Sequence, residues 1–225
     1  MTQKYFVTGS GTGIGKTLVT ASLAYQLRAG GKRVSALKPV ISGYVEGDMS
    51  SDTAQLLQSL GQAVNPLTIA AVSPWKFAAP LAPNMAAAAE GKEIIFSEVV
   101  DFCNVSRTSE ITLIEGAGGM MSPLTKAQTM LDVAVALECP AIVVVGTYLG
   151  AISHALTACE VLRAHGVAVQ AVVVSESAES ATSTEQTALM LKSFLPYAKY
   201  IVPLPRVAGG ENLWHHTADL TWILT

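Results

Sequence analysis

Short apolar runs alternate with amphipathic segments along most of the chain. The apolar runs have the length and β-branched content of strands, and they predict strands over residues 5–8, 33–37, 111–114, 141–145, 167–174 and 200–202. Apolar residues at three- and four-residue spacing predict helices over residues 16–29, 85–90, 96–106, 130–137, 152–164 and 184–194, with another helix beginning near 50–52. Apolar strands that alternate with helices are typical of a parallel sheet covered on both faces.

Two segments lack such a period. Four prolines interrupt the stretch from residue 61 to residue 83, so we expect irregular structure there. The residues after Val202 are expected to form a loose tail. The sequence contains no internal repeat, low-complexity stretch or linker. We therefore expect one three-layer α/β domain spanning residues 1–225, with a mostly parallel sheet.

The composition excludes several functions and compartments. Half of the 225 residues are hydrophobic and 14% are charged, with a net charge of -3 and no cluster of Lys or Arg. Such a chain is not expected to bind nucleic acid. Its longest apolar run, 141–145, is too short to span a membrane. We expect a cytoplasmic protein, because the three cysteines lack disulfide or metal spacing and the first residues leave no room for a signal peptide.

The strongest chemical signal follows the first predicted strand. Residues 5–17 read Tyr-Phe-Val-Thr-Gly-Ser-Gly-Thr-Gly-Ile-Gly-Lys-Thr and lead directly into a helical pattern. Glycines allow successive N–H groups to face a phosphate, Lys16 adds a positive charge, and the Thr17 hydroxyl can hold Mg²⁺. Five residues separate Gly9 from Gly15, one more than usual. The pattern predicts a variant phosphate-binding loop for a nucleoside triphosphate.

Other chemically distinctive residues follow strands of the predicted sheet. Lys38 could reach a phosphoryl group or an anionic substrate, although a surface lysine is an equal alternative. Glu115 ends an apolar strand, where Mg²⁺, a substrate ammonium or a salt bridge would compensate its charge. Asp52 could bind metal or simply begin a helix, with Asp48 and Glu46 as rival acids. Because ligands bind at the carboxyl ends of parallel strands, these residues form a candidate site.

A second glycine turn, from Leu149 to His154, follows the apolar run 141–145. It opens another predicted helix, so its backbone N–H groups could hold an anion such as a carboxylate. We interpret His154 as a capping or packing residue rather than as a catalyst.

Together these segments resemble dethiobiotin synthetase, the ATP-dependent ring-closing enzyme of biotin synthesis and a member of the P-loop NTPase superfamily. The resemblance covers most of the chain in order. It comprises the loop 5–17, Lys38-Pro39-Val40 with Ser42-Gly43, Ser51-Asp52, the segment 77–83, Glu115-Gly116-Ala117-Gly118-Gly119 with Pro123-Leu124, and Leu149-Gly150 with Ile152 and His154.

The resemblance implies a reaction and a set of site residues. 7,8-Diaminopelargonic acid would combine with CO₂ to give a carbamate, ATP would phosphorylate it, and the second amine would close the ureido ring. Lys16, Lys38 and Ser42 would be catalytic, and Thr17, Asp52 and Glu115 would hold Mg²⁺. The nucleotide would contact Gly11, Thr12, Gly13, Ile14, Gly15, Lys16, Thr17, Glu115, Gly116, Gly118, Ser175 and Pro203.

The resemblance also implies a homodimer with its active site at the subunit interface. The substrate would contact Thr12, Lys38, Ser42, Pro80, Glu115, Gly118, Leu149, Gly150, Ala151 and Ser153, the turn at Gly150 coming from the partner. Ser175-Glu176 stands where several members of the family carry an Asn that reads the adenine. At the turn, Ser153 replaces a common Asn and Ala151 is a further change.

Two other classes share parts of this pattern. P-loop switch ATPases of the ParA and MinD kind act on a protein partner and share the Gly-Lys-Thr sequence. They usually place a second lysine where Gly11 stands, and their membrane-binding forms end in a basic helix that this chain lacks. A cobyrinate-type amidating enzyme would need a glutaminase Cys-His pair, and the sequence shows none.

Overall fold

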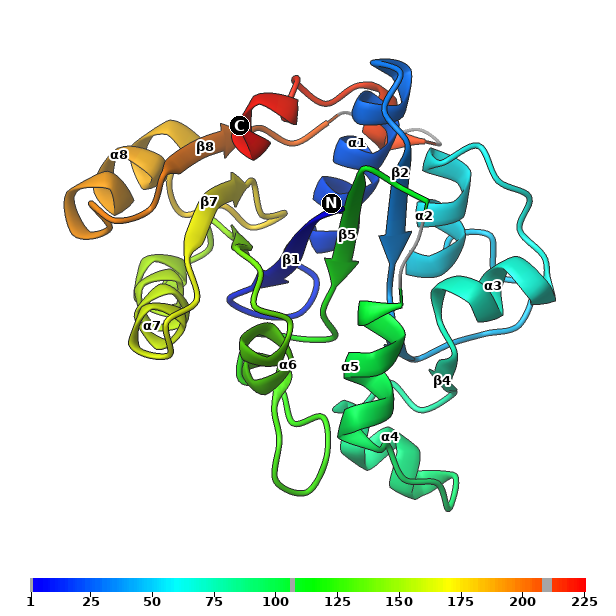
Figure 1. Cartoon of the computed structure of the whole chain (residues 1–225). Coiled ribbons are helices and arrows are strands. Elements are labelled where there is room, and N and C mark those ends of the chain that lie inside the picture. The colour runs from blue at the N-terminus through cyan, green and yellow to red at the C-terminus, as the bar shows by residue number, and fades with distance from the viewer. Residues whose placement is uncertain (1, 106–107, 208–211) are drawn as a thin grey trace.

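The computed structural model describes residues 2–105, 108–207 and 212–225. Its main sheet is parallel and has the strand order β2-β5-β1-β6-β7-β8 (Figure 1). The strands are β1 (Gln3–Gly9), β2 (Val34–Leu37), β5 (Ile111–Glu115), β6 (Ala141–Val145), β7 (Val169–Ser175) and β8 (Tyr200–Leu204). The expected three-layer α/β fold is confirmed.

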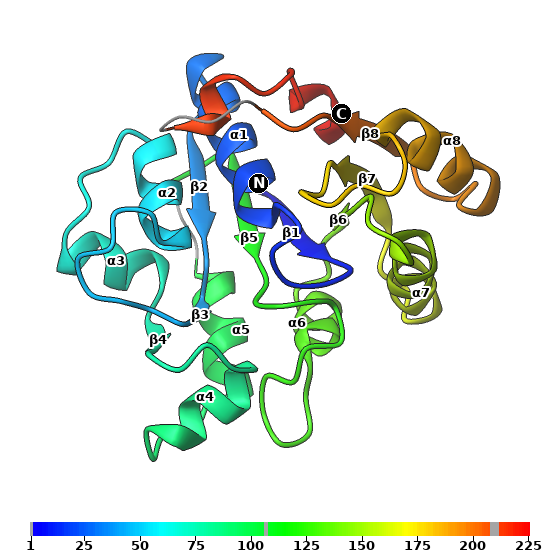
Figure 2. The same cartoon turned by 180° about the vertical axis from the view of Figure 1, so that it is seen from behind.

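Helices cover both faces of this sheet (Figures 1 and 2). They are α1 (Lys16–Ala29), α2 (Asp52–Ser59), α3 (Pro66–Val72), α4 (Pro83–Ala89), α5 (Phe96–Asn104), α6 (Met130–Ala136), α7 (Ala151–Ala164) and α8 (Thr184–Phe194). One face packs against α1 and α2, and the other against α5, α6, α7 and α8. Both β5 and β6 are buried along their whole length, as a sheet covered on both sides requires.

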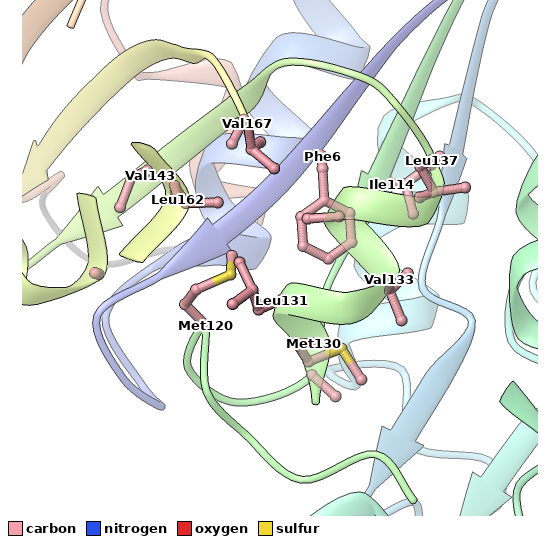
Figure 3. Packing of buried hydrophobic residues seen from close by; sticks show 14 of the residues in the cluster. Phe6, Ile114, Met120, Met130, Leu131, Val133, Leu137, Val143, Leu162 and Val167 are labelled. Carbon is pink, nitrogen blue, oxygen red and sulfur yellow. The ribbon is translucent and has the colours of Figure 1, made fainter. Parts of the chain in front are cut away.

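The central strand contributes to both cores because its side chains alternate between the two faces of the sheet. Phe6 of β1 packs toward α6 in the cluster that contains Leu131 and Met130 (Figure 3). Val7, the next residue, belongs to the opposite cluster together with Val19 of α1. The position of β1, and therefore of the loop that follows it, is fixed from both sides.

The register of the strands brings their carboxyl ends to one edge. Val7 of β1 is paired with Glu115, the last residue of β5, and Gly9 is paired with Val144 of β6. The expectation that polar residues after different strands meet at one edge is therefore confirmed for β1 and β5. This edge carries the site described below.

The stretch from 61 to 83 is more regular than we expected. It contains α3, and its strand β4 (Trp75–Phe77) pairs in parallel with β3 (Val40–Ser42) in a small second sheet. Asn65 begins α3 with a capping box to Thr68, and Pro66 occupies the first turn, where its missing N–H costs nothing. The prolines thus begin helices α3 and α4 rather than prevent them.

The expectation of a loose tail is wrong. Its described part forms the short 3₁₀ helices η1 (Leu213–His215) and η2 (Thr221–Leu224), with Trp214 buried against the α1 side of the core. The Gln26 side chain of α1 donates to the Ala218 carbonyl and accepts from the Leu220 N–H, both at 2.9 Å. The tail is ordered by these long-range contacts, which no local pattern in the sequence reveals. Among the described residues, no helix has the length and apolar content needed to cross a membrane.

Candidate active site

The predicted phosphate loop lies between β1 and α1, as expected. Gly15 precedes the first turn of α1 and no side chain caps that turn, so the helix N-terminus is open to an anion. Gly15 has φ 94°, and a Cβ there would lie 2.7 Å from the Ser175 hydroxyl. Only glycine satisfies both conditions. The Lys16 ammonium donates to the Gly11 carbonyl at 2.7 Å and is thereby held against the loop.

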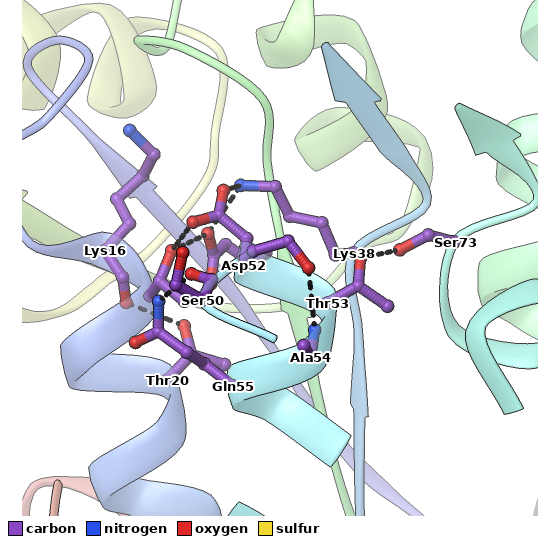
Figure 4. A network of polar contacts seen from close by, with 12 residues as sticks. Lys16, Thr20, Lys38, Ser50, Asp52, Thr53, Ala54, Gln55 and Ser73 are labelled. Carbon is purple, nitrogen blue, oxygen red and sulfur yellow. Dashed lines mark hydrogen bonds and ion pairs between the residues drawn. The ribbon is translucent and has the colours of Figure 1, made fainter. Parts of the chain in front are cut away.

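Three strand- or helix-end residues meet in a buried charged cluster beside this loop (Figure 4). The Lys38 Nζ atom lies 2.6 Å from Glu115 Oε1 and 2.8 Å from Asp52 Oδ2. The Thr17 hydroxyl lies 2.8 Å from both Asp52 Oδ1 and Glu115 Oε1. Lys38 and Glu115 are buried, so the surface-lysine interpretation of Lys38 is wrong. We call Thr17, Lys38, Asp52 and Glu115 the charged cluster.

The pKa values of the two lysines are shifted in opposite directions. Burial lowers the pKa of Lys16 to about 8, and repulsion from Lys38 adds to this effect. Burial also acts to lower the pKa of Lys38, but the negative charges and hydrogen bonds of Glu115 and Asp52 outweigh it and raise that pKa. For Asp52, burial is opposed by Lys38, which holds the pKa of the carboxyl below its usual range. Lys38 and Asp52 are therefore both charged at neutral pH.

Two buried side-chain oxygen atoms, one in the charged cluster and one at the end of β3, have no partner among the described residues. They are Glu115 Oε2 and Ser42 Oγ. A buried polar atom without a hydrogen bond costs free energy unless a ligand supplies one, so these atoms mark positions where a bound group would be stabilised. Ser42 reaches this region because it ends β3.

The oxygen atoms of the cluster fit Mg²⁺. Within the described ranges, no group of three or more His, Cys, Asp or Glu could hold a metal by itself. Mg²⁺ is instead commonly bound by one or two carboxylates together with phosphate oxygens and water. The carboxylates of Asp52 and Glu115, the Thr17 hydroxyl and the unpartnered Glu115 Oε2 meet this description.

A cavity of about 790 Å³ opens between the loop, the charged cluster and the start of α4. Its charged end contains Lys16, Lys38 and Glu115. The rest of its wall includes the apolar side chains of Leu18, Val40, Ile41, Pro80, Leu81, Ala82, Pro83 and Ala117. The shape and lining suit a ligand with an anionic or aminated end and an aliphatic part.

A second cavity of about 450 Å³ begins at the other side of the same loop. Thr12, Gly13 and Gly15 line both cavities. The second cavity extends past Ser175 toward residues 205–207 of the chain after β8. A nucleotide whose phosphates lie on the loop would therefore have its base on this side.

Most of the expected site residues line one of these two cavities. They are Thr12, Gly13, Ile14, Gly15, Lys16, Thr17, Lys38, Ser42, Asp52, Pro80, Glu115, Gly118 and Ser175. The other expected residues are not part of either lining. They are Gly11, Gly116, Leu149, Gly150, Ala151, Ser153 and Pro203.

The residues outside the cavities fall into two groups. Gly11 remains part of the loop through its carbonyl, whereas Pro203 lies within β8 and its neighbour Pro205 lines the second cavity instead. Gly150 precedes α7 with φ 96° and no side-chain cap, and the adjacent Leu149 is 91% exposed. We call Leu149–Ser153 the α7 turn. Within one chain none of its residues lines either cavity, and its predicted role stays a prediction.

The structure places Asp52 at the site, and not the alternative acids Asp48 and Glu46. Asp48 accepts hydrogen bonds from the N–H and the hydroxyl of Ser50, which lowers its pKa, and Glu46 is exposed. Neither lines the large cavity. Sequence reasoning missed Gln55 and Ser122, which do line it, and Tyr148, which lines the second cavity. Gln55 lies on α2 one turn after Asp52, which was a readable signal; the other two follow from tertiary packing alone.

Solved structures with this fold include proteins of different activities. The signal recognition particle receptor FtsY from Elizabethkingia anophelis is 14% identical, with a TM-score of 0.52, over 100% of this chain and 62% of that chain. The MinC:MinD cell division protein complex of Aquifex aeolicus gives a TM-score of 0.54 at 14% identity, covering 95% of this chain and 85% of that one. At this identity the likeness concerns the fold alone, a P-loop NTPase fold.

Sequence relatives are much closer to this chain. A family described as an AAA domain matches residues 3–204. The ATP-dependent dethiobiotin synthetase BioD of Methylobacterium nodulans is 50% identical over 81% of this chain and 85% of that protein. The protein of the same name from Caulobacter vibrioides is 46% identical over 92% of this chain and 94% of its own. With this identity over nearly the whole length, the chain belongs to the dethiobiotin synthetase family.

Proposed function

We propose that this enzyme makes dethiobiotin from 7,8-diaminopelargonic acid, CO₂ and ATP. The observation that carries the proposal is the large cavity, which joins a phosphate loop and two lysines to an apolar wall. A diamine with a long aliphatic chain needs both kinds of surface, and a switch ATPase that acts on a protein partner needs no such apolar wall.

The substrate's diamine end lies at the charged cluster. The Glu115 carboxylate and the Ser42 hydroxyl both have buried oxygen atoms without a partner, and they accept hydrogen bonds from amines or from the carbamate N–H. The aliphatic chain then runs along Val40, Ile41 and Leu81. Positioning the reacting groups in this way supplies much of the rate enhancement that such a ring closure needs.

The reaction proceeds in three steps. One amine attacks CO₂ and loses a proton, which gives a carbamate. A carbamate oxygen attacks the γ-phosphorus of ATP, and the bond to the β-phosphate oxygen breaks to release ADP. The second amine attacks the carbonyl carbon of the carbamic-phosphoric anhydride, phosphate leaves, and a proton is lost as the ureido ring closes.

The protein's contribution to phosphoryl transfer is charge neutralisation. Lys16 and Lys38 lie on the walls of one cavity, and both carry the positive charge that the anionic carbamate and γ-phosphate require. Thr17, Asp52 and Glu115 would hold Mg²⁺, which neutralises phosphate charge when it is bound. None of these steps needs a nucleophilic thiol or histidine.

The substrate's distant carboxylate requires a second copy of the chain. In one chain the α7 turn lies outside the large cavity and exposes Leu149, so it is free to serve a neighbouring site. In a homodimer the turn of one subunit binds the carboxylate held by the other, through backbone N–H groups at an open helix N-terminus. We place the enzyme in the cytoplasm, where ATP is available and its three buried cysteines remain reduced.

The test is ADP release from Mg-ATP and bicarbonate, with and without 7,8-diaminopelargonic acid, with the product identified by mass. Strong stimulation and a product of the mass of dethiobiotin are expected, and the Lys16→Ala variant should lack both. An ATP turnover rate that the diamine does not change would contradict the proposal and direct the search to a protein partner.

A further inference from the structure

Tyr148 is the one aromatic ring among the described residues that line the second cavity. It follows β6, and it lines the cavity together with Ser175 and the segment 205–207. A nucleobase presents a flat π-face to its site, and an aromatic ring is the side chain that stacks on it most strongly.

Contacts of the side chain and of its backbone hold Tyr148 in place. Its hydroxyl shares a hydrogen bond of 2.8 Å with Nδ1 of His154, one turn into α7. Its backbone carbonyl accepts from the Ala151 N–H at 2.9 Å. A Cβ at Gly146 would lie 2.7 Å from Cδ1 of the ring, so the ring packs directly on the Gly146 backbone. An aromatic side chain fixed in this way loses little conformational entropy when a ligand binds.

Hydrogen bonds also hold the loop after β6, which carries Tyr148. The Thr147 N–H donates to the Ser177 hydroxyl at 3.0 Å, and the Ser177 N–H donates to the Thr147 hydroxyl at 2.9 Å. These two bonds tie the loop after β6 to the loop after β7, which forms the facing part of the cavity. His154 is exposed to solvent, and within the described part of the chain no hydrogen bond or ion pair joins it to the charged cluster.

We propose that Tyr148 is the side chain on which the nucleobase stacks and that His154 is its positioning residue. This inference rests on the proposed function only for the presence of a nucleotide. It gives His154 a role other than the capping or packing role expected from the sequence.

The test measures affinity for ADP and for inorganic tripolyphosphate by calorimetry, without diamine or bicarbonate. Tyr148→Ala should weaken ADP binding at least about fivefold, because base stacking contributes about 1–3 kcal/mol, and should leave tripolyphosphate binding unchanged. Tyr148→Phe and His154→Ala should each weaken ADP binding about threefold, and the double variant should be no weaker, since both remove one hydrogen bond. His165→Ala, at the other end of α7, is the matched control and should bind as the wild type does.

Unchanged ADP affinity in Tyr148→Ala would overturn the inference. Equal losses for ADP and tripolyphosphate would also overturn it, because the ring would then support the loop rather than the base. If Tyr148→Ala does not fold, judged by its melting curve, Tyr148→Leu and His154→Ala decide the question. A wild type that binds ADP in this way but makes no dethiobiotin would contradict the proposed function while the inference stands.

Discussion

The charged cluster and the α7 turn are the two ends of the proposed substrate site, and they are built in opposite ways. Lys38 and Glu115 of the charged cluster are buried and Asp52 is partly exposed, and each of these ionic groups has a partner at 2.6–2.8 Å within the same chain. The α7 turn is exposed at Leu149 and offers backbone groups at a helix N-terminus. One end is complete in a single chain, whereas the described residues of the other end line neither of the two cavities.

The difference follows from what each end must recognise. Transfer of a phosphoryl group requires preorganised charges in a site from which water is excluded, and a sheet edge inside one chain provides this. A carboxylate far from the reacting centre needs only binding, which a surface turn of another copy can supply. Mutations should therefore affect rate and stability at the first end, and binding of the substrate carboxylate at the second.

The largest effect is expected from removing the Lys38 charge. Lys38→Ala should lower turnover about 10²–10³-fold, because one preorganised charge at the developing anion is lost. ADP affinity should change little, since ADP lacks the γ-phosphate that Lys38 serves. Turnover by ADP release and ADP affinity by calorimetry check this, with the exposed Lys32→Ala as the control. Near-normal turnover would remove Lys38 from the mechanism.

The buried cluster should also dominate stability. Glu115→Ala leaves Lys38 buried with only the partly exposed Asp52 as a partner, so the free energy of unfolding should fall by about 3 kcal/mol. Urea unfolding measures this. Glu110→Ala removes the same carboxylate from an exposed pair and should barely move the unfolding midpoint. Similar midpoints for the two variants would mean that the cluster does not hold the site together.

The contributions of Lys16 and Lys38 can be distinguished by measuring ADP affinity as a function of pH. Phosphate binding needs the protonated Lys16, whose pKa of about 8 in the free protein means that the charge is lost above pH 8. ADP affinity measured in a chelator should be constant below pH 8 and fall about tenfold per pH unit well above it. The raised pKa of Lys38 keeps that residue charged over this range, so the fall reports Lys16.

Lys16→Arg is the control for this profile, because a guanidinium stays charged throughout the range. Its ADP affinity should be nearly independent of pH between 7 and about 10. An equally steep fall in Lys16→Arg would assign the titration to another group.

The charged end could largely be predicted from the sequence, since strand ends converge by topology. Thr17, Lys38 and Glu115 each follow an apolar run or a glycine loop that is recognisable locally, and parallel pairing brings them together. Choosing Asp52 over Asp48 required the structure, because Asp48 lies just before α2 and Asp52 begins it, and only the direction of the helix decides which carboxylate reaches Lys38.

Other features depended on contacts distant in sequence. The C-terminal tail is ordered through Gln26, more than 190 positions away, so its local pattern gave no reason to expect order. The local sequence around Tyr148 does not distinguish it from other loop residues, because its place in the second cavity depends on the residues that follow β7 and β8. By contrast, α3 was missed although Asn65 and Pro66 are standard signals for a helix start, because four prolines were weighed only as breakers.

Mixing two inactive variants tests whether the charged cluster of one subunit and the α7 turn of the other form one site. Lys16→Ala disables the phosphate loop, and Gly150→Trp disables the α7 turn, since a side chain at φ 96° is strained and fills the space of the anion. If each site combines the loop of one subunit with the turn of the other, a mixed dimer has one site with both defects and one intact site. Random exchange in a symmetric dimer then restores about a quarter of wild-type turnover.

Of the variants without an intact site of their own, the mixture of these two is therefore expected to have the turnover nearest to that of the wild type. Subunit exchange is verified with two different affinity tags, and turnover is measured before and after mixing. The matched control mixes Lys16→Ala with Lys38→Ala: both defects lie in the cavity of the same chain, so no intact site can form and turnover should stay near zero. Confirmed exchange without recovery in the first mixture would place the α7 turn outside the neighbouring site, and the two ends would no longer belong to one substrate.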